Sequence, residues 1–118
     1  MMTARYYILA GITPVPAEQR QWAAWVETAD RRVAQTSFTA DVRVSTVFVG
    51  IDHATGATPP LLFETLVFWP GDPLDGETVH TPTWAAALAA HTQMVLRVRA
   101  ALCAPSEDAT LGASDPLT

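Results

Sequence analysis

Asp52 and His53 are adjacent where an apolar segment meets a loop rich in glycine and proline, within residues 49–60. An acid beside a histidine is a pattern found in catalytic pairs. Successive residues of a strand point to opposite faces, so these two side chains meet only if the strand ends before them. Two further ionisable residues, Glu64 and His91, interrupt apolar sequence elsewhere. These four residues are the candidates for chemistry in this chain.

Glu64 lies inside a segment whose β-branched and aromatic residues predict a buried strand. An ionised carboxylate is costly there unless it is paired or hydrogen-bonded. If this strand pairs in a hairpin with residue 51 opposite residue 61, Glu64 lies opposite Phe48. A register shifted by one residue turns Glu64 toward His53 instead. The register therefore decides which group is its neighbour.

In either register we expect Glu64, the Asp52–His53 corner and His91 to converge at one end of the sheet, with His91 reaching up from a helix beneath it. The corner would form one wall of a pocket, and Glu64 or His91 would form its floor. A structural explanation stays open. Glu64 and His91 then form a buried pair, or each bonds an arginine or a backbone amide, while Asp52 caps the loop.

Such a cluster has two enzymatic interpretations. His53, His91 and a carboxylate make a plausible ligand set for a metal, but the chain lacks a compact motif such as His-Glu-x-x-His. A hydrolase needs an activated nucleophile, and Ser45 or Thr46 near His53 is weak support because strand hydroxyls usually face a neighbour. A small hydrolase or metal-dependent enzyme using Glu64, His53 and His91 is the alternative. We expect no bound metal, no cofactor and no catalytic residue.

The same cluster has two binding interpretations, a small-molecule pocket and a surface for a protein partner. A pocket needs only a few placed polar groups, whereas a partner would use exposed tryptophan or an edge strand. Trp69 ends a strand just before Pro70, so we expect it at a rim where it can stack on a ligand. Arg97 either receives a phosphate or belongs to a solvated helix face. The predicted ligand-binding residues are Asp52, His53, Glu64, His91, Trp69 and Arg97.

The periodicity of apolar residues predicts the elements that position these side chains. It favours an α+β fold with an antiparallel sheet of three to four strands, in the order β-α-β-β-β-α, and two helices packed on one face. The expected strands cover residues 5–10, 42–51, 61–69 and 77–80, and the expected helices lie within 16–35 and 80–104.

Each expected helix has one apolar stripe that should pack against the sheet. The second helix has Thr81 as a suitable N-cap with Pro82 at its first position, and Thr83 as an alternative cap. The predicted stripes are Trp22, Trp25, Val26, Ala29 and Val33 in the first helix, and Trp84, Leu88, His91, Val95, Val98 and Leu102 in the second.

Neither face of the hairpin at 42–51 and 61–69 is polar, because valine, leucine, isoleucine and phenylalanine occupy both odd and even positions. Both faces therefore need cover. Two helices can cover one face, and a second subunit is the simplest cover for the other. We expect a homodimer or a larger homo-oligomer.

The composition limits the remaining classes. At 118 residues with 49% hydrophobic and 16% charged, the chain predicts one domain over 1–103 and a disordered tail over 104–118. A net charge of -5 argues against nucleic-acid binding, and no apolar run reaches the length of a membrane span. The single Cys103 and the absence of a signal-peptide pattern favour the cytoplasm.

Several short pieces of sequence occur in a recognisable order: Val-Ser-Thr-Val-Phe at 44–48, Gly-Ile-Asp-His at 50–53, Leu-Phe-Glu-Thr at 62–65, Thr-Trp at 83–84, and His91. Together they resemble a family of small proteins encoded by tailed bacteriophages and prophages, over roughly residues 6–100. The chain departs from that pattern at Ala90, where the family usually has glycine, and at 77–80, which is often basic and aromatic. The resemblance implies a phage or prophage origin and carries no established activity.

These observations predict a non-enzymatic phage or prophage accessory protein in the cytoplasm of the host cell. We expect it to bind a small molecule, such as a nucleotide-like signal in counter-defence, or a host protein, and to do so as a homo-oligomer. We expect neither a nucleic-acid nor a membrane partner.

Overall fold

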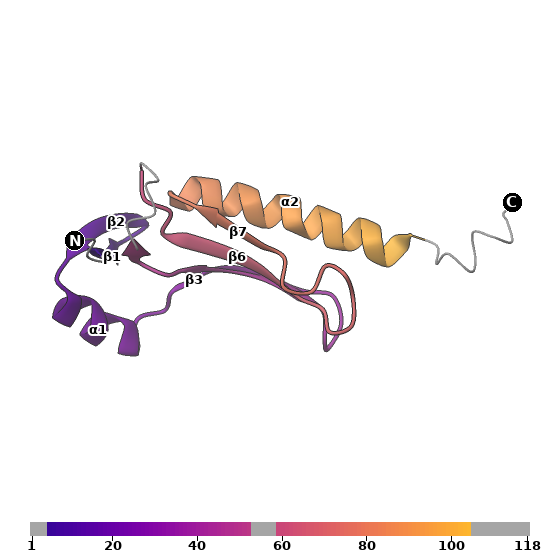
Figure 1. The fold of residues 1–118 in the computed structure, drawn as a ribbon, viewed down its shortest axis with the longest axis horizontal. Coiled ribbons are helices and arrows are strands. Elements are labelled where there is room, and N and C mark those ends of the chain that lie inside the picture. Colours follow the sequence, from indigo (N-terminus) through magenta and orange to yellow (C-terminus); the bar gives the residue numbers. More distant parts are fainter. Residues whose placement is uncertain (1–4, 53–58, 105–118) are drawn as a thin grey trace, which may run out of the picture.

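The computed structural model describes residues 5–52 and 59–104, and these form antiparallel sheets and helices in an α+β fold (Figure 1). The expected class is confirmed, and the expected order of elements is approximately met. The elements are β1 (Arg5–Ala10), β2 (Thr13–Ala17), α1 (Gln19–Thr28), β3 (Arg32–Ser37), β4 (Arg43–Phe48), β5 (Ile51–Asp52), β6 (Phe63–Phe68), β7 (Thr78–Thr81) and α2 (Trp84–Cys103). Apart from Ala104, the predicted tail lies outside the described residues.

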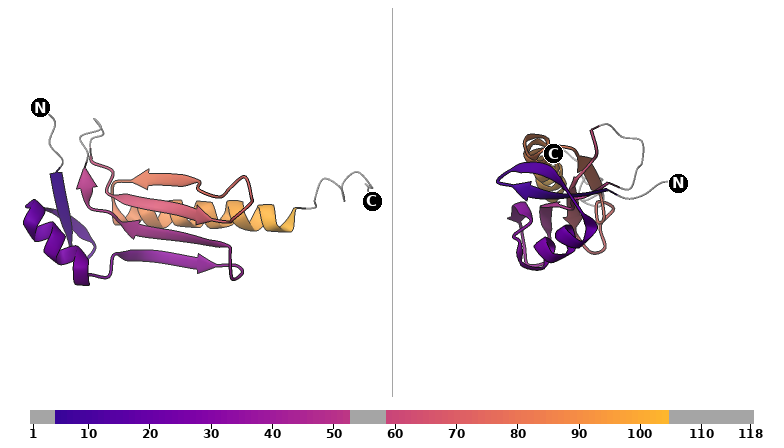
Figure 2. Two further views of the ribbon diagram at one scale, coloured as in Figure 1. Left: turned by 60° about the horizontal axis from the view of Figure 1, so that its bottom comes forward. Right: turned by 90° about the vertical axis from the view of Figure 1, so that its left-hand side faces the viewer.

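The strands divide between two sheets, where the sequence pattern predicted one. The smaller sheet has the order β2-β1-β5 and the larger has the order β3-β4-β6-β7. α2 runs along one face of the four-stranded sheet, whereas α1 packs against β1 at one end of the molecule (Figures 1 and 2). The two helices therefore pack against different sheets, and not on one face of a single sheet as expected.

The helix expected within 16–35 is much shorter, because its two ends form strands. Residues 13–17 pair with β1 as an edge strand, and residues 32–37 pair with β4. The turn into β3 is fixed by Asp30, whose Oδ1 accepts a hydrogen bond from the backbone N–H of Arg32 at 3.1 Å. Pairing with neighbouring strands thus overrides the helical spacing of the apolar residues.

Gly50 divides the strand expected at 42–51. Its φ of +75° is a left-handed conformation that favours glycine, and it directs the chain from β4 in the larger sheet to β5 in the smaller. A Cβ at Gly50 would lie 2.6 Å from the carbonyl oxygen of Tyr7 and 2.8 Å from a ring carbon of Phe48. A larger residue at this crossing therefore requires the two sheets to move apart.

In the larger sheet, the register of β4 against β6 differs by one residue from the pairing of 51 with 61. Phe48 lies opposite Phe63, and Glu64 lies opposite Val47. The face toward α2, called the inner face, carries the buried side chains of β4 and β6: Val44, Thr46, Phe48, Phe63, Thr65 and Val67.

Helix α2 begins at Trp84, and Thr83 is its N-cap: the Thr83 hydroxyl accepts the Ala86 N–H at 3.0 Å. The alternative cap is therefore the correct one. The buried stripe consists of Ala87, His91, Met94 and Val98. This stripe is rotated from the predicted one, so Leu88 is 42% exposed and Leu102 is 40% exposed. Alanine at 87 suits a site already filled by the rings of Phe48 and Phe63.

Two apolar clusters form the core beneath α2. One contains Val42, Val44, Val67, Met94 and Val98, and the other contains Phe48, Leu62, Phe63 and Ala87. The second cluster joins the two sheets, because Trp25 of α1 packs edge-on against Phe48 with ring centroids 5.7 Å apart. Among the described residues, no helix is long and apolar enough to cross a bilayer.

Candidate functional site

The predicted cluster of Glu64 and His91 does not assemble, because the two side chains lie on opposite faces of the four-stranded sheet. His91 contacts Thr46 on the inner face, whereas Glu64 alternates with the buried Phe63 and Thr65 and so points to the other face. Its partner there is His80 of β7, whose Nε2 lies 3.3 Å from a Glu64 carboxylate oxygen. The expected convergence is therefore wrong.

Asp52 lies apart from Glu64 and His91. Asp52 belongs to β5 in the smaller sheet and is opposite Arg5 of β1. His53 lies outside the described residues. Because Gly50 turns the chain out of the larger sheet, Asp52 does not continue the face that carries Glu64.

Trp69 and Arg97 take structural positions. Trp69 packs against the apolar cluster around Val67 and Met94, and its backbone N–H donates to the Asp75 carboxylate at 2.7 Å. Nη1 of Arg97 lies 3.1 Å from the Glu77 carboxylate in an exposed ion pair. The five predicted residues that the structure describes are thus spread over separate places, and no group of three metal-ligating side chains occurs within the described ranges.

The structure places His91 in a hydrogen-bonded chain of threonines that the sequence pattern missed. His91 Nε2 lies 2.9 Å from Thr36 Oγ1, and His91 Nδ1 lies 2.9 Å from Thr46 Oγ1. Thr46 Oγ1 lies 2.7 Å from Thr65 Oγ1. The chain links α2 to β3, β4 and β6. Its signal in the sequence is a threonine between two apolar inner-face residues in both β4 and β6.

The hydrogen bonds of this chain have one favourable direction. If the Thr65 hydroxyl donates to Thr46, Thr46 donates to Nδ1 of His91. The Nε2–H of His91 then donates to Thr36, which is only half-buried and can direct its own proton to solvent. The reverse direction leaves the proton of the fully buried Thr65 without an acceptor among the described residues. The neutral tautomer protonated at Nε2 is therefore the one that satisfies the network.

Burial lowers the pKa of His91 below its ordinary value of 6.5. The inner face offers no compensating acid, because the side chains that alternate toward α2 are neutral: Ala34 and Thr36 of β3, Val44, Thr46 and Phe48 of β4, Phe63, Thr65 and Val67 of β6, and Val79 and Thr81 of β7. The network therefore holds a neutral imidazole, which is a structural arrangement without a free nucleophile.

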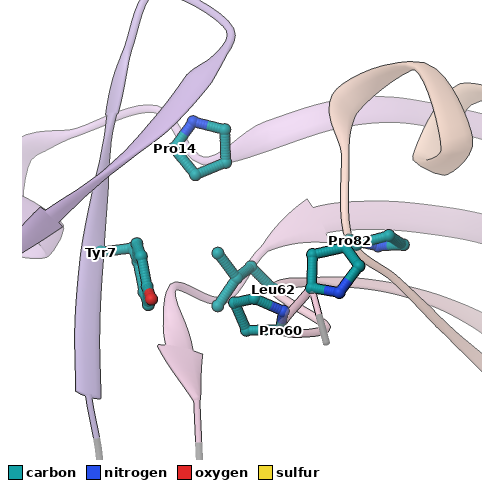
Figure 3. A pocket seen from close by; sticks show the side chains of 6 residues that line it. Tyr7, Pro14, Pro60, Leu62 and Pro82 are labelled. Atoms are coloured by element: carbon teal, nitrogen blue, oxygen red, sulfur yellow. The ribbon is translucent and has the colours of Figure 1, made fainter. Parts of the chain in front are cut away.

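A small apolar hollow of about 220 Å³ lies at the junction of the two sheets. Tyr7 and Pro14 of the β1–β2 hairpin face Leu62, Pro60 and Pro82 across it (Figure 3). None of the predicted ligand-binding residues Asp52, Glu64, His91, Trp69 and Arg97 is in the lining of this hollow.

The face of the four-stranded sheet opposite α2, called the outer face, is uncovered. In Figure 2 (left) no helix lies over it, and α1 stands beyond its end. Val47, Leu66 and Phe68 are half-buried there, and the Arg43 guanidinium lies 4.0 Å from the ring centroid of Phe68. The outer face consists of Arg32, Gln35, Ser37, Arg43, Ser45, Val47, Glu64, Leu66, Phe68, Thr78 and His80.

Comparisons with protein-family models, with curated proteins and with solved structures give no match for this chain. The phage origin implied by the sequence resemblance stays a prediction. Function is therefore inferred from geometry.

Proposed function

We propose that the chain is a non-enzymatic accessory protein of a phage or prophage that acts by binding, as a homo-oligomer whose protomers meet through the outer face. The single observation that carries the proposal is the uncovered outer face with its apolar centre. A solvated face of an antiparallel sheet normally carries polar residues, whereas this one carries Val47, Leu66 and Phe68, which pair across the strands with Glu64, Ser45 and Arg43.

The charges of the outer face favour a second copy as its cover. Arg43 lies at one end of the β4–β6 pair and Glu64 at the other, with Ser45 and Leu66 between them. A two-fold axis that runs across the strands through this central pair places Arg43 of one copy over Val47 of the other, next to Glu64. His80, which contacts Glu64, sits at the same end. Arg43 of one copy therefore lies within reach of Glu64 of the other, and Leu66 lies at the centre of the contact, although Arg32 adds a positive charge at the Glu64 end.

The apolar hollow at Tyr7 supports binding of a small molecule or of a side chain from a host protein. Its described lining has proline and leucine walls, one phenol and no charged group. An apolar group therefore suits this hollow better than the phosphate of a nucleotide-like ligand.

Native mass spectrometry and light scattering of the full chain test the self-association. We expect a mass that is a multiple of the 12.7 kDa protomer. Leu66→Glu should lower that mass, because it places a carboxylate at the centre of the contact. Leu88→Glu is the matched control, since Leu88 is 42% exposed on α2, away from the outer face.

Charge reversal tests the orientation of the two copies. Arg43→Glu should weaken the assembly, because it places two carboxylates together, and Arg43→Glu with Glu64→Arg should restore it. A 12.7 kDa monomer at all concentrations contradicts the proposal, and so does a Leu66→Glu variant with the mass of the wild type.

A further inference from the structure

The edges of the two sheets differ in how they are protected against pairing with another chain. β2, an edge of the smaller sheet, contains Pro14 and Pro16, and the opposite edge, β5, has 2 residues. β7, an edge of the larger sheet, has 4 residues. Proline and short length are two of the ways in which proteins prevent strand addition. β3 is the remaining edge, with 6 residues, no proline and a single charge, at Arg32.

The free edge of β3, on the side away from β4, also presents backbone N–H and C=O groups in a regular row. The Phe38 N–H donates to the Val42 carbonyl at 2.8 Å, and antiparallel pairs alternate between bonded and non-bonded residues. Thr36 and Ala34 therefore bond to β4, while the N–H and C=O groups of Gln35 and Ser37 point away from the sheet. In Figure 2 (left), nothing lies beside this edge.

We infer that β3 is a second interface between copies of this chain, at which β3 of another protomer adds in antiparallel orientation and joins two four-stranded sheets into one of eight strands. The inference deepens the proposed function and rests on its claim of self-association. It names the place where a further copy binds.

A two-fold axis through Gln35 gives a register that satisfies both strands. Gln35 then pairs with its own copy, and Ala34 pairs with Thr36 of the second copy, so residues on the same face stay together. The irregularity between Arg32 and Ala34 limits the pairing to residues 33–37. The two Arg32 side chains lie at opposite ends, about 20 Å apart at the rise of an extended strand, which is beyond the screening length of about 8 Å at physiological salt.

The size of the outer face independently favours this second copy. Four strands of about six residues cover roughly 19 by 20 Å, or about 400 Å², half of the ~800 Å² that each partner buries in an interface of standard size. Joining two sheets at β3 doubles the continuous face. The outer-face contact then reaches the standard size without any further element.

The two-fold axes of the two contacts are compatible with one closed assembly. The axis at β3 is normal to the sheet, whereas the axis of the outer-face contact is parallel to it. Two perpendicular two-fold axes close a tetramer in which two eight-stranded sheets face one another and the α2 helices lie outside. The expected mass is about 51 kDa, four times the 12.7 kDa protomer.

Gln35→Pro tests the β3 contact, because it removes a backbone N–H that points away from β4 and has no acceptor among residues 5–52 and 59–104. Gln35→Ala is the matched control, since it removes the side chain and keeps that N–H. With native mass spectrometry we expect about 51 kDa for the wild type and for Gln35→Ala, and about 25 kDa for Gln35→Pro. Wild-type mass in a folded Gln35→Pro variant overturns the inference.

Hydrogen exchange of the wild type gives a second measurement that needs no variant. The amides of Gln35 and Ser37 should be protected in the assembly and should lose protection on dilution to the monomer. Fast exchange of both amides in the assembled protein contradicts pairing at β3, whatever the behaviour of Gln35→Pro.

The two proposals fail in distinguishable ways. If only the outer-face contact is absent, the wild type is a dimer that Gln35→Pro dissociates and Leu66→Glu leaves intact. If only the β3 contact is absent, Leu66→Glu yields the monomer and Gln35→Pro has no effect on mass. When both are present, only the double variant is a monomer. A wild-type monomer at all concentrations overturns both.

Discussion

The inner and outer faces of the four-stranded sheet come from alternate residues of the same strands, yet they differ in burial, in charge and in hydrogen bonding. Along β4 the inner residues Val44, Thr46 and Phe48 are fully buried, while the residues between them are half-buried. On the inner face Thr36, Thr46, Thr65 and His91 are hydrogen-bonded to one another, and only the Thr81 hydroxyl is buried without a partner among the described residues. The outer face holds the charges of Arg43 and Glu64. Which residues form the core is therefore decided by the position of α2 and by the register of β4 against β6, and not by hydrophobicity alone.

The largest expected effect is on packing. Phe63→Ala on the inner face should reduce the free energy of unfolding by about 3–5 kcal/mol, because it removes a fully buried ring. Phe68→Ala on the outer face should cost roughly 1 kcal/mol in the dissociated protomer, since half-buried positions lose less. Urea unfolding at low protein concentration measures both values. Equal losses would contradict the distinction between the faces.

A smaller effect is expected in the polar network. Thr46→Val keeps the shape of the side chain but leaves His91 Nδ1 without its partner, and an unsatisfied buried group costs about 1–3 kcal/mol. Ser45→Ala, on the outer face of the same strand, should change stability by less than about 0.5 kcal/mol. Thermal and urea unfolding of the two variants measure the contrast, and an unchanged Thr46→Val protein would show that the network contributes nothing.

The smallest effect concerns pH. The pKa of His91 is lowered in the folded protein, so the unfolded chain binds more protons near pH 6. Stability should therefore be complete above about pH 6.5 and fall as the pH drops from 6.5 toward the folded pKa, with a slope of at most about 1.4 kcal/mol per pH unit. Unfolding free energies at pH 5.5 to 8 should show this slope in the wild type and lose it in His91→Gln.

His80→Gln is the control for this titration, because His80 lies on the outer face with 52% of its side chain exposed. The slope should persist in that variant. A slope that disappears with His80 instead of His91 would place the titrating group on the outer face.

The sequence was sufficient for the elements whose pattern agrees with their tertiary contacts. β1, β6 and α2 lie close to their expected bounds, and His91 is on the helix face that packs against the sheet. The expected helix at 16–35 was wrong in both flanks, because strand pairing with β1 and β4 is a long-range interaction that helical spacing does not reveal.

The predicted site failed for a reason of register. A shift of one residue moves every side chain of a strand to the other face, and the observed pairing of Val47 with Glu64 separates Glu64 from His91. Gly50 added a second reason, because its positive φ ends β4 and carries Asp52 into another sheet. A lone glycine in an apolar run indicates a break, but the direction of the chain after it depends on contacts with Tyr7.

The crossing at Gly50 also has a consequence for the order of folding. The β1–β2 hairpin closes locally around Gly11, whereas the third strand of that sheet pairs Tyr6 with Ile51, across a long loop whose closure has an entropic cost. β5 reaches its place only once β4 is fixed. We therefore expect the β1–β2 hairpin to form early and the smaller sheet to be completed last, when β5 pairs with β1. In the native protein, β5 should be the first strand to unfold locally.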